Sequence, residues 1–166
     1  RILEAAAAAP DHGELRPWRF FLLAGAGMDA FGQVLADSYL ARCEALGAAP
    51  TPGQLAKERT KLGRAPLVLV VAAVHRHSET IPFEEQFAAA AAAAQNALVA
   101  ATALGYGSMW RTGDPAYDLR VKAALGLSEH DAIVGFLYLG TVPEGNERRA
   151  RTPVVDDVVE WWQPPG

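Results

Sequence analysis

The sequence has very few of the features that mark disulfide-bonded, secreted or membrane-spanning proteins. Its 166 residues include one cysteine, Cys43, which excludes an intrachain disulfide. No apolar run is both long enough and free enough of charge to span a bilayer, and no secretory signal stands at the amino terminus. These absences predict a cytoplasmic protein without a membrane partner.

Positive charge is in short supply as well. Arg and Lys number 15 against 19 Asp and Glu, which gives a formal net charge of −4. Because nucleic-acid binding requires a basic face, we expect no nucleic-acid partner. The length suits one domain over residues 1–166. The chain opens without Met, inside a helix-like stretch at residues 2–9, so we expect this domain to lack its N-terminal segment.

Motifs that carry catalytic or metal-binding side chains are also missing. Gly105-Tyr-Gly107 resembles the start of a dinucleotide fingerprint, but it follows a helix rather than a strand and the third glycine is absent. His75 and His77 have no acidic or cysteine partner at metal-site spacing, and an ordinary exposed loop is the simpler interpretation. None of the serines stands in a nucleophile-elbow context. We therefore expect no catalytic side chain and no metal, and a bound cofactor that carries the chemistry.

Hydrophobic patterning predicts an α+β domain with a small sheet and long helices. Runs rich in apolar, β-branched or aromatic residues predict extended segments at residues 18–23, 67–74, 108–112 and 132–141. Apolar residues at helical spacing predict helices at residues 28–46, 51–62, 83–104 and 118–125.

Charged and turn residues add detail to three of these helices. In the helix at 51–62 we expect the charged side chains to face water, namely Lys57, Glu58, Arg59 and Lys61. Glu84 and Glu85 begin the longest helix, where acidic residues interact favourably with the helix dipole. Gly105 ends that helix as its C′ residue, and residues 113–115 form a turn before the last helix.

The tail of the chain, residues 152–162, is rich in valine and tryptophan. A free end with this composition would expose a large apolar surface. The β-branched and aromatic content predicts an extended arm that packs on another surface, for example that of a second subunit.

Three segments, in register over nearly the whole chain, resemble the nitroreductase family and its small bacterial YdjA-like subgroup. Residues 9–20, Ala-Pro-Asp-His-Gly-Glu-Leu-Arg-Pro-Trp-Arg-Phe, resemble the family's Pro-Ser-Ser-x-Asn-x-Gln-Pro-Trp signature in the variant with Asp-His in place of Ser-Ser. Residues 104–113 resemble the family's glycine loop ahead of its second flavin contact. Residues 133–141 are similar to its closing strand.

The resemblance implies a nitroreductase-like α+β fold with a small, mostly antiparallel sheet flanked by long helices. It also implies a homodimer whose subunits exchange terminal segments and form two FMN sites at their interface. The implied activity is that of an FMN-dependent NAD(P)H oxidoreductase. Hydride passes through the flavin by ping-pong chemistry to a small-molecule acceptor, either nitroaromatic or quinone-like.

The same resemblance assigns site residues position by position. His12 falls at a flavin contact, with an ordinary turn histidine as the alternative. Trp110, Arg111 and Thr112 fall on the segment that reaches the partner subunit's flavin. Arg111 would supply positive charge to the phosphate or the reduced ring, and the alternatives are a surface salt bridge for Arg111 and a core position for Trp110. The nicotinamide nucleotide is assigned to the end of the long helix, namely Ala100, Ala101, Thr102, Ala103, Leu104 and Gly105.

The chain departs from the family pattern where positive charge is expected. The Arg-Arg-Ser-like motif that binds the FMN phosphate is absent, Ala8 stands where the subgroup often has Arg, and Arg16 replaces the usual Gln. Each lost charge-assisted contact would be worth roughly 1.5–3 kcal/mol, so we expect the chain as given to bind FMN poorly or not at all. These departures support an alternative, a non-catalytic dimeric member that binds a ligand or partner without redox turnover.

Overall fold

The computed structural model describes residues 1–145, 154–156 and 158–165. Their helices and strands follow in the order α1 (Ile2–Ala7), η1 (His12–Glu14), β1 (Trp18–Leu23), α2 (Gly25–Ala45), α3 (Pro52–Thr60), η2 (Lys61–Arg64), β2 (Leu67–Ala73), α4 (Phe83–Ala103), β3 (Gly107–Arg111), α5 (Asp114–Tyr117), α6 (Leu119–Ala124) and β4 (Ala132–Gly140), where η marks a 3₁₀ turn. None of the described helices is long and apolar enough to cross a membrane.

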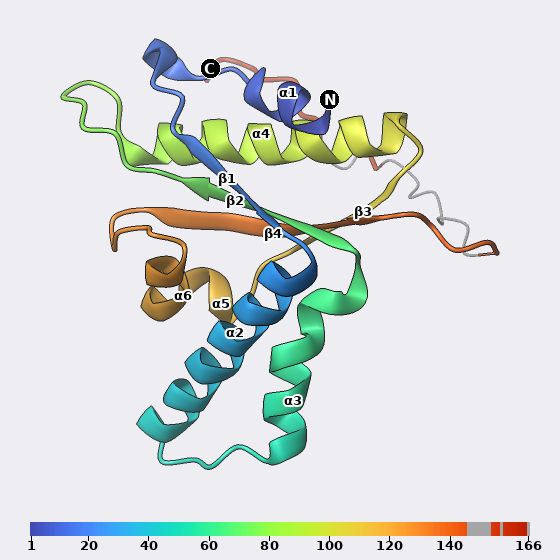
Figure 1. The fold of residues 1–166 in the computed structure, drawn as a ribbon. Coiled ribbons are helices and arrows are strands. Elements are labelled where there is room, and N and C mark those ends of the chain that lie inside the picture. Colours follow the sequence, from blue (N-terminus) through green and yellow to red (C-terminus); the bar gives the residue numbers. More distant parts are fainter. Residues whose placement is uncertain (146–153, 157, 166) are drawn as a thin grey trace.

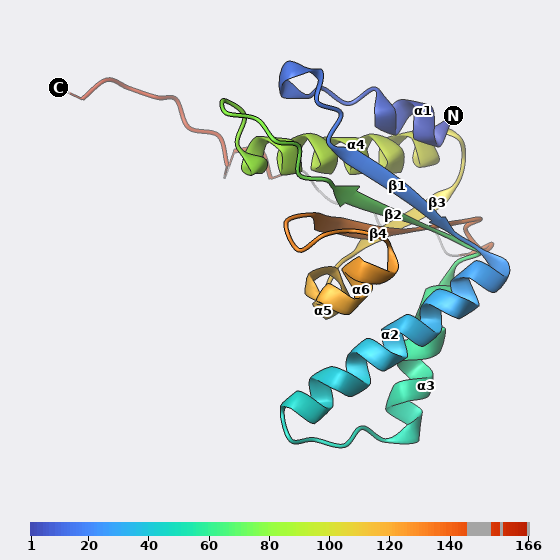
Figure 2. The ribbon, with the colours of Figure 1, turned by 60° about the vertical axis from the view of Figure 1, so that its left-hand side comes forward.

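One antiparallel sheet of four strands, in the order β1-β2-β4-β3, divides the molecule into two layers of helices. Figure 1 shows α1 and α4 on one face of the sheet, with α2, α3, α5 and α6 on the other. The turned view in Figure 2 keeps the same separation. The structure therefore confirms the predicted α+β class, with a small antiparallel sheet between long helices.

The central strand β2 contributes to both layers because successive side chains of a strand point to opposite faces. Val68, Val70 and Ala72 belong to the core shared with α2, α5 and α6. Leu69, Val71 and Ala73 belong to the core shared with α1 and α4. All six are fully buried, as expected for a continuous apolar run in a strand covered on both faces.

The helix α4 covers its face of the sheet with alanine. The buried alanines recur at helical spacing and are Ala89, Ala90, Ala93, Ala94, Ala97 and Ala101. Because alanine adds little bulk, α4 can lie close to the sheet on one side and to α1 on the other. Asn96 Nδ2 donates to the carbonyl oxygen of Ala5 at 3.1 Å, which ties α1 to the middle of α4.

A bulge in β4 decides which side chains face the second layer. Val71 of β2 pairs with Gly135 and the next residue pairs with Ile133, so one residue of β4 has no counterpart. A bulge of this kind reverses the alternation of faces beyond it. Phe136 and Tyr138 consequently lie on the same face as Ile133, toward α2 and α5.

The structure corrects two local predictions. Residues 114–117 form the short helix α5 rather than only a turn, because Pro115 occupies the first helical turn and is compatible with it. Glu58 and Lys61 form an ion pair with side chains only 19% and 21% exposed, so the prediction that they face water is wrong. The 3₁₀ turn η2 bends the chain back toward the sheet and brings Lys61 with it.

The described part of the tail, residues 154–156 and 158–165, contains no strand. Its side chains are strongly exposed, with Trp161 at 90% and Trp162 at 80%. The remaining residues of the predicted arm, 152, 153 and 157, lie outside the described part of the chain. Within the described chain this apolar segment is left uncovered.

Candidate functional site

His12 lies in a tight turn at the amino-terminal end of α4. Its Nδ1 is 2.8 Å from Glu85 Oε2. Because a carboxylate only accepts hydrogen bonds, Nδ1 donates and Nε2 remains available to a ligand. Glu85 therefore does more than interact with the dipole of α4, since it also fixes the orientation of the predicted flavin contact.

The backbone around His12 takes left-handed conformations at three nearby positions. Gly13 has a φ of 69°, and the non-glycine residues Glu14 and Arg16 have φ values of 53° and 46°. Each non-glycine position of this kind costs about 1–3 kcal/mol and persists where its surroundings enforce it. Here the Asp11 carboxylate accepts the backbone N–H of Arg16 at 2.8 Å. The side chain of Arg16 is exposed and makes no ion pair with the described residues.

The loop of residues 76–81 packs against the turn that contains His12. The buried Gln86 of α4 holds residues 76–81 through bonds from its Nε2 to the carbonyl oxygens of Arg76 and Ile81, and one from Arg76 N to its Oε1. Ile81 in turn fills the space beside Gly13, where a Cβ would come within 2.7 Å of the Ile81 side chain. The His12 turn is thus packed against a loop that is itself tied to α4.

The second predicted flavin segment lies at the end of β3. Trp110 and Arg111 point to opposite faces of the sheet, as neighbours in a strand do. The Trp110 indole packs in the α4 layer and donates from Nε1 to the carbonyl oxygen of Val134 at 3.2 Å. Arg111 and Thr112 instead line a cavity on the α2 and α5 side.

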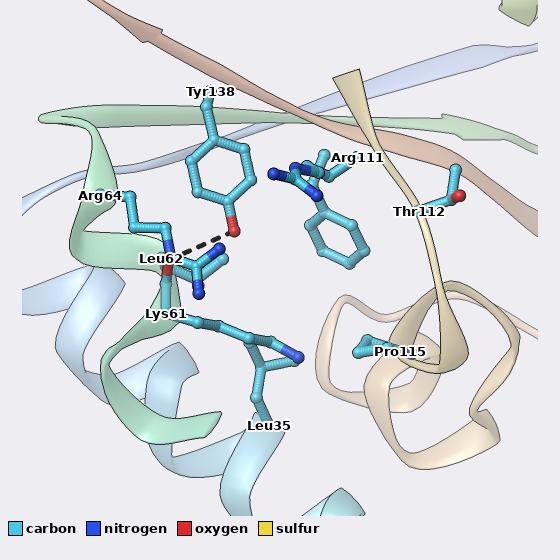
Figure 3. A pocket seen from close by; sticks show the side chains of 9 residues that line it. Leu35, Lys61, Leu62, Arg64, Arg111, Thr112, Pro115 and Tyr138 are labelled. Atoms are coloured by element: carbon cyan, nitrogen blue, oxygen red, sulfur yellow. Dashed lines mark hydrogen bonds between the residues drawn. The ribbon is translucent and has the colours of Figure 1, made fainter. Parts of the chain in front are cut away.

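This cavity, of about 150 Å³, brings together residues from five parts of the chain. Figure 3 shows Arg64 of η2, Arg111 of β3 and Tyr138 of β4 around one space. The remaining lining residues are Leu35, Lys61, Leu62, Thr112, Pro115 and Phe136. Tyr138 Oη donates a long bond to the carbonyl oxygen of Lys61 at 3.4 Å. Burial raises the pKa of Tyr138 above its usual value, although Arg64 and Arg111 oppose the rise, so its hydroxyl stays protonated at neutral pH.

A part-buried polar network ties α2 to Asp118, which lies between α5 and α6. Ser38 Oγ donates to Asp118 Oδ2 at 2.6 Å, and Arg42 Nη1 donates to the same oxygen at 3.0 Å. Burial alone would raise the pKa of Asp118, but bonds from Ser38, Arg120 N and Arg42 outweigh it and lower the pKa. The ionised Asp118 also caps α6 through Arg120 N. The network joins α2 to the junction of α5 and α6, and Leu35 of α2 and Pro115 of α5 line the cavity.

The predicted nicotinamide segment forms the carboxyl-terminal end of α4. Gly105, with a φ of 84°, ends the helix as predicted, and Tyr106 N donates to the carbonyl oxygen of Ala101 at 2.9 Å. Ala101 is fully buried, whereas Leu104 is exposed and lines an open hollow with Arg1, Ile2, Leu3 and Tyr106. Residues 102–105 are exposed, so the end of the helix is accessible to a ligand.

The structure does not bring the three predicted groups together within one chain. His12 contacts Glu85 at the start of α4, and the 18 residues from there to Ala103 span about 27 Å of helix. Arg111 and Thr112 lie across the sheet from His12, on the face of α2. The described residues contain no cluster of His, Cys, Asp or Glu that could hold a metal ion.

Sequence reasoning overlooked three residues of this region. The sequence pattern predicts only a helix-dipole role for Glu85, whereas its carboxylate accepts a hydrogen bond from His12, 73 positions earlier in the chain. Arg64 and Tyr138 carry no local motif, and only the bulge in β4 and the turn η2 place them beside Arg111. No pattern within a short window of sequence could have identified them.

The chain is similar to known proteins over most of its length. The family model described as the Nitroreductase family matches residues 1–141. YdjA of Escherichia coli K12, named as a candidate NAD(P)H nitroreductase, is 38% identical over 140 residues, which are 84% of this chain and 73% of YdjA. A Haemophilus influenzae protein named in the same way is 30% identical over 162 residues, 97% of this chain and 85% of its own.

Solved structures show the same fold. A nitroreductase-like family protein from Bacillus cereus superposes with a TM-score of 0.74 at 26% identity, covering 96% of this chain and 81% of its own. A nitroreductase with bound FMN from Bacteroides fragilis gives a TM-score of 0.68 at 22% identity, covering 98% and 84%. The chain thus belongs to the nitroreductase family, a family of oxidoreductases.

Proposed function

We propose that the protein is an FMN-dependent NAD(P)H oxidoreductase that works as a homodimer on nitroaromatic or quinone-like acceptors. The observation that carries this proposal is the cavity at the end of β3, where Arg111 and Thr112, both expected at the flavin, meet Arg64 and Tyr138. Relatives named as NAD(P)H nitroreductases and a fold neighbour with bound FMN support the choice of cofactor and reductant.

The residues present suit an anionic, hydrogen-bonding cofactor. Arg111 makes no ion pair with the described residues, and its Nε donates only to Met109 Sδ at 3.1 Å. An unpaired guanidinium in this position offers positive charge to the FMN phosphate or to the ring edge that becomes electron-rich on reduction. His12 Nε2 and the Arg16 side chain offer polar groups to the same cofactor from the other half of the site.

A dimer would bring together the proposed flavin contacts that lie apart within one chain. His12 and Arg111 lie on opposite faces of the sheet, so a flavin that touches both needs them from different chains. The exposed tail, with Trp161 and Trp162, supplies apolar surface for a second copy to cover. Symmetric homodimers are the commonest soluble oligomers.

The chemistry then follows from the cofactor. Bound FMN would supply hydride-transfer chemistry between NAD(P)H and the second substrate, and the two substrates would react in turn in ping-pong fashion. With one proton taken up from solvent, a quinone would leave as the hydroquinone, or a nitroaromatic as the nitroso compound and water, while NAD(P)H becomes NAD(P)⁺. The carboxyl-terminal end of α4 at Ala100–Gly105, exposed from Thr102 onward, is the proposed position of the nicotinamide nucleotide.

Purification followed by absorption spectroscopy tests the proposal. We expect a flavin spectrum, or uptake of added FMN with quenching of its fluorescence, and NAD(P)H oxidation that depends on an added quinone or nitroaromatic. Arg111→Ala should weaken FMN binding by about 10-fold or more, as loss of one charge-assisted contact does. Arg120→Ala, on α6, is the matched control and should leave FMN binding unchanged.

A protein that takes up no FMN and oxidises no NAD(P)H would instead support a non-catalytic dimer that binds a ligand without turnover. Ala8 and Arg16, which stand where the subgroup often has Arg and Gln, favour that second candidate. Both candidates require a dimer. Sedimentation velocity therefore tests the oligomeric state independently of the activity.

A further inference from the structure

The cavity beside Thr112 has apolar walls and a cationic edge. Leu35, Leu62, Pro115 and Phe136 supply the apolar surface, and Phe136 presents an aromatic ring. Arg64, Arg111 and Tyr138 reach the same space from three different elements, as Figure 3 shows. A site of this composition suits a ligand with one apolar body and one anionic end.

Two of the three basic side chains in this cavity make no ion pair with the described residues. Lys61 is neutralised by its ion pair with Glu58. Arg64 and Arg111, by contrast, make no ion pair with any of the residues that the structure describes. Their planar guanidinium groups match the geometry of a carboxylate, which accepts two parallel hydrogen bonds from such a fork. The protonated Tyr138 hydroxyl adds a third donor.

The size of the cavity limits the apolar body of the ligand. Its volume of about 150 Å³ is close to that of an apolar protein cavity that takes up benzene. Pockets that enclose drug-sized ligands measure roughly 300–1,000 Å³. The enclosed part of this half-open cavity thus fits a single aromatic ring.

On the basis of the proposed function, we propose that this cavity selects electron acceptors made of one aromatic ring that carries a carboxylate. Arg64 and the Tyr138 hydroxyl bind the carboxylate, Leu62 and Phe136 pack against the ring, and Arg111 is left to the proposed flavin. The position next to Thr112 places the opposite, reducible end of the acceptor toward the proposed flavin. Arg64 is the specificity residue, because nothing in the flavin assignment otherwise requires it.

Two acceptors of matched shape test this proposal on the FMN-loaded enzyme. 4-Nitrobenzoate and 4-nitrobenzamide differ in charge and hardly in size. We expect kcat/KM to favour the carboxylate by about 10- to 100-fold, the effect of one charge-assisted hydrogen bond. Arg64→Gln should reduce that preference to a few-fold, mainly through a higher KM for 4-nitrobenzoate. Arg59→Gln, an exposed arginine on α3, is the matched control and should keep it.

A binding measurement separates this inference from the proposed function. Benzoate titrated against the protein should bind more tightly than benzamide, and Arg64→Gln should remove the difference; calorimetry gives this result with or without bound FMN. A flavin-loaded, active enzyme with no preference for carboxylates would overturn the inference and leave the proposed function intact. An Arg64→Gln variant that loses FMN affinity but keeps the carboxylate preference would also overturn it, because the cavity would then belong to the cofactor. An inactive protein without flavin that still binds benzoate through Arg64 would support the cavity and refute the proposed function.

Discussion

Gly135 of β4 offers a sharp test of how the sheet positions the site. A Cβ at this position would lie 2.1 Å from Trp110 Nε1 and 2.6 Å from Trp110 Cδ1. It would also lie 3.1 Å from the carbonyl oxygen of Arg111. The indole cannot move away freely, because it is packed in the α4 layer and its N–H donates to the carbonyl oxygen of Val134.

Gly135→Ala should therefore lower the free energy of unfolding by about 2–4 kcal/mol. Overpacking of a core costs about 1–3 kcal/mol, and the displaced indole loses a hydrogen bond worth about 1 kcal/mol. Urea unfolding followed by tryptophan fluorescence measures this loss as a lower midpoint at unchanged slope. Gly53→Ala in α3 is the matched control, because nothing lies within 4 Å of its new Cβ. That variant should be neutral or gain up to about 1 kcal/mol.

A double-mutant cycle with Trp110→Leu identifies the cause of the effect. Leucine is shorter than the indole and leaves room for the new methyl group, so Gly135→Ala should cost less than about 1 kcal/mol in that background. An equal cost in both backgrounds would refute the proposed clash. A Gly135→Ala protein as stable as the wild type would refute the close approach of Trp110 to β4.

Three further predictions concern the elements around the site. Asp118→Asn should lower the free energy of unfolding by about 1–3 kcal/mol at pH 7, because Ser38 and Arg42 lose a buried carboxylate. The folded state lowers the pKa of Asp118, so this contribution is complete above its ordinary value of about 3.9 and disappears as pH falls through the folded value; a difference between wild type and variant that is the same at pH 3 and pH 7 would contradict the assignment. Thr51→Ala removes the capping box at the start of α3 and should cost about 1 kcal/mol in urea unfolding, whereas a cost near zero would show that the box is dispensable. Gln86→Leu should speed amide hydrogen exchange at Arg76, whose N–H donates to Gln86 Oε1, and unchanged protection would show that the loop is held by other contacts.

The strands could be predicted because each has a local cause. Residues 67–74 form a continuous apolar, β-branched run, and β2 occupies Leu67–Ala73 with every residue after Leu67 buried. β1 coincides with the predicted 18–23, where aromatic residues follow Pro17. The pattern at residues 83–104 likewise predicts the long helix α4. Gly105 follows its end because a left-handed φ suits glycine. The residues that cause each of these features are neighbours in the sequence, so a short window of sequence is enough to predict them.

The site could be predicted only in part, because its geometry depends on residues far apart in the chain. Resemblance pointed to His12 and to residues 110–112, but not to the partner that orients His12. Lys61 looked like a surface residue of an amphipathic helix, yet the turn η2 carries it into the cavity wall. The bulge in β4 arises from pairing with β2, so no local pattern shows that Tyr138 faces Arg111.

The sheet that separates His12 from Arg111 also has a genetic consequence. On the proposed dimer, the His12 and the Arg111 that face one flavin belong to different chains. A cell that makes one chain with His12→Ala and another with Arg111→Ala would form mixed dimers, each with one intact and one doubly altered site. With random pairing about half of the dimers are mixed, so about a quarter of all sites are restored. Two alleles that are each inactive alone would therefore complement one another.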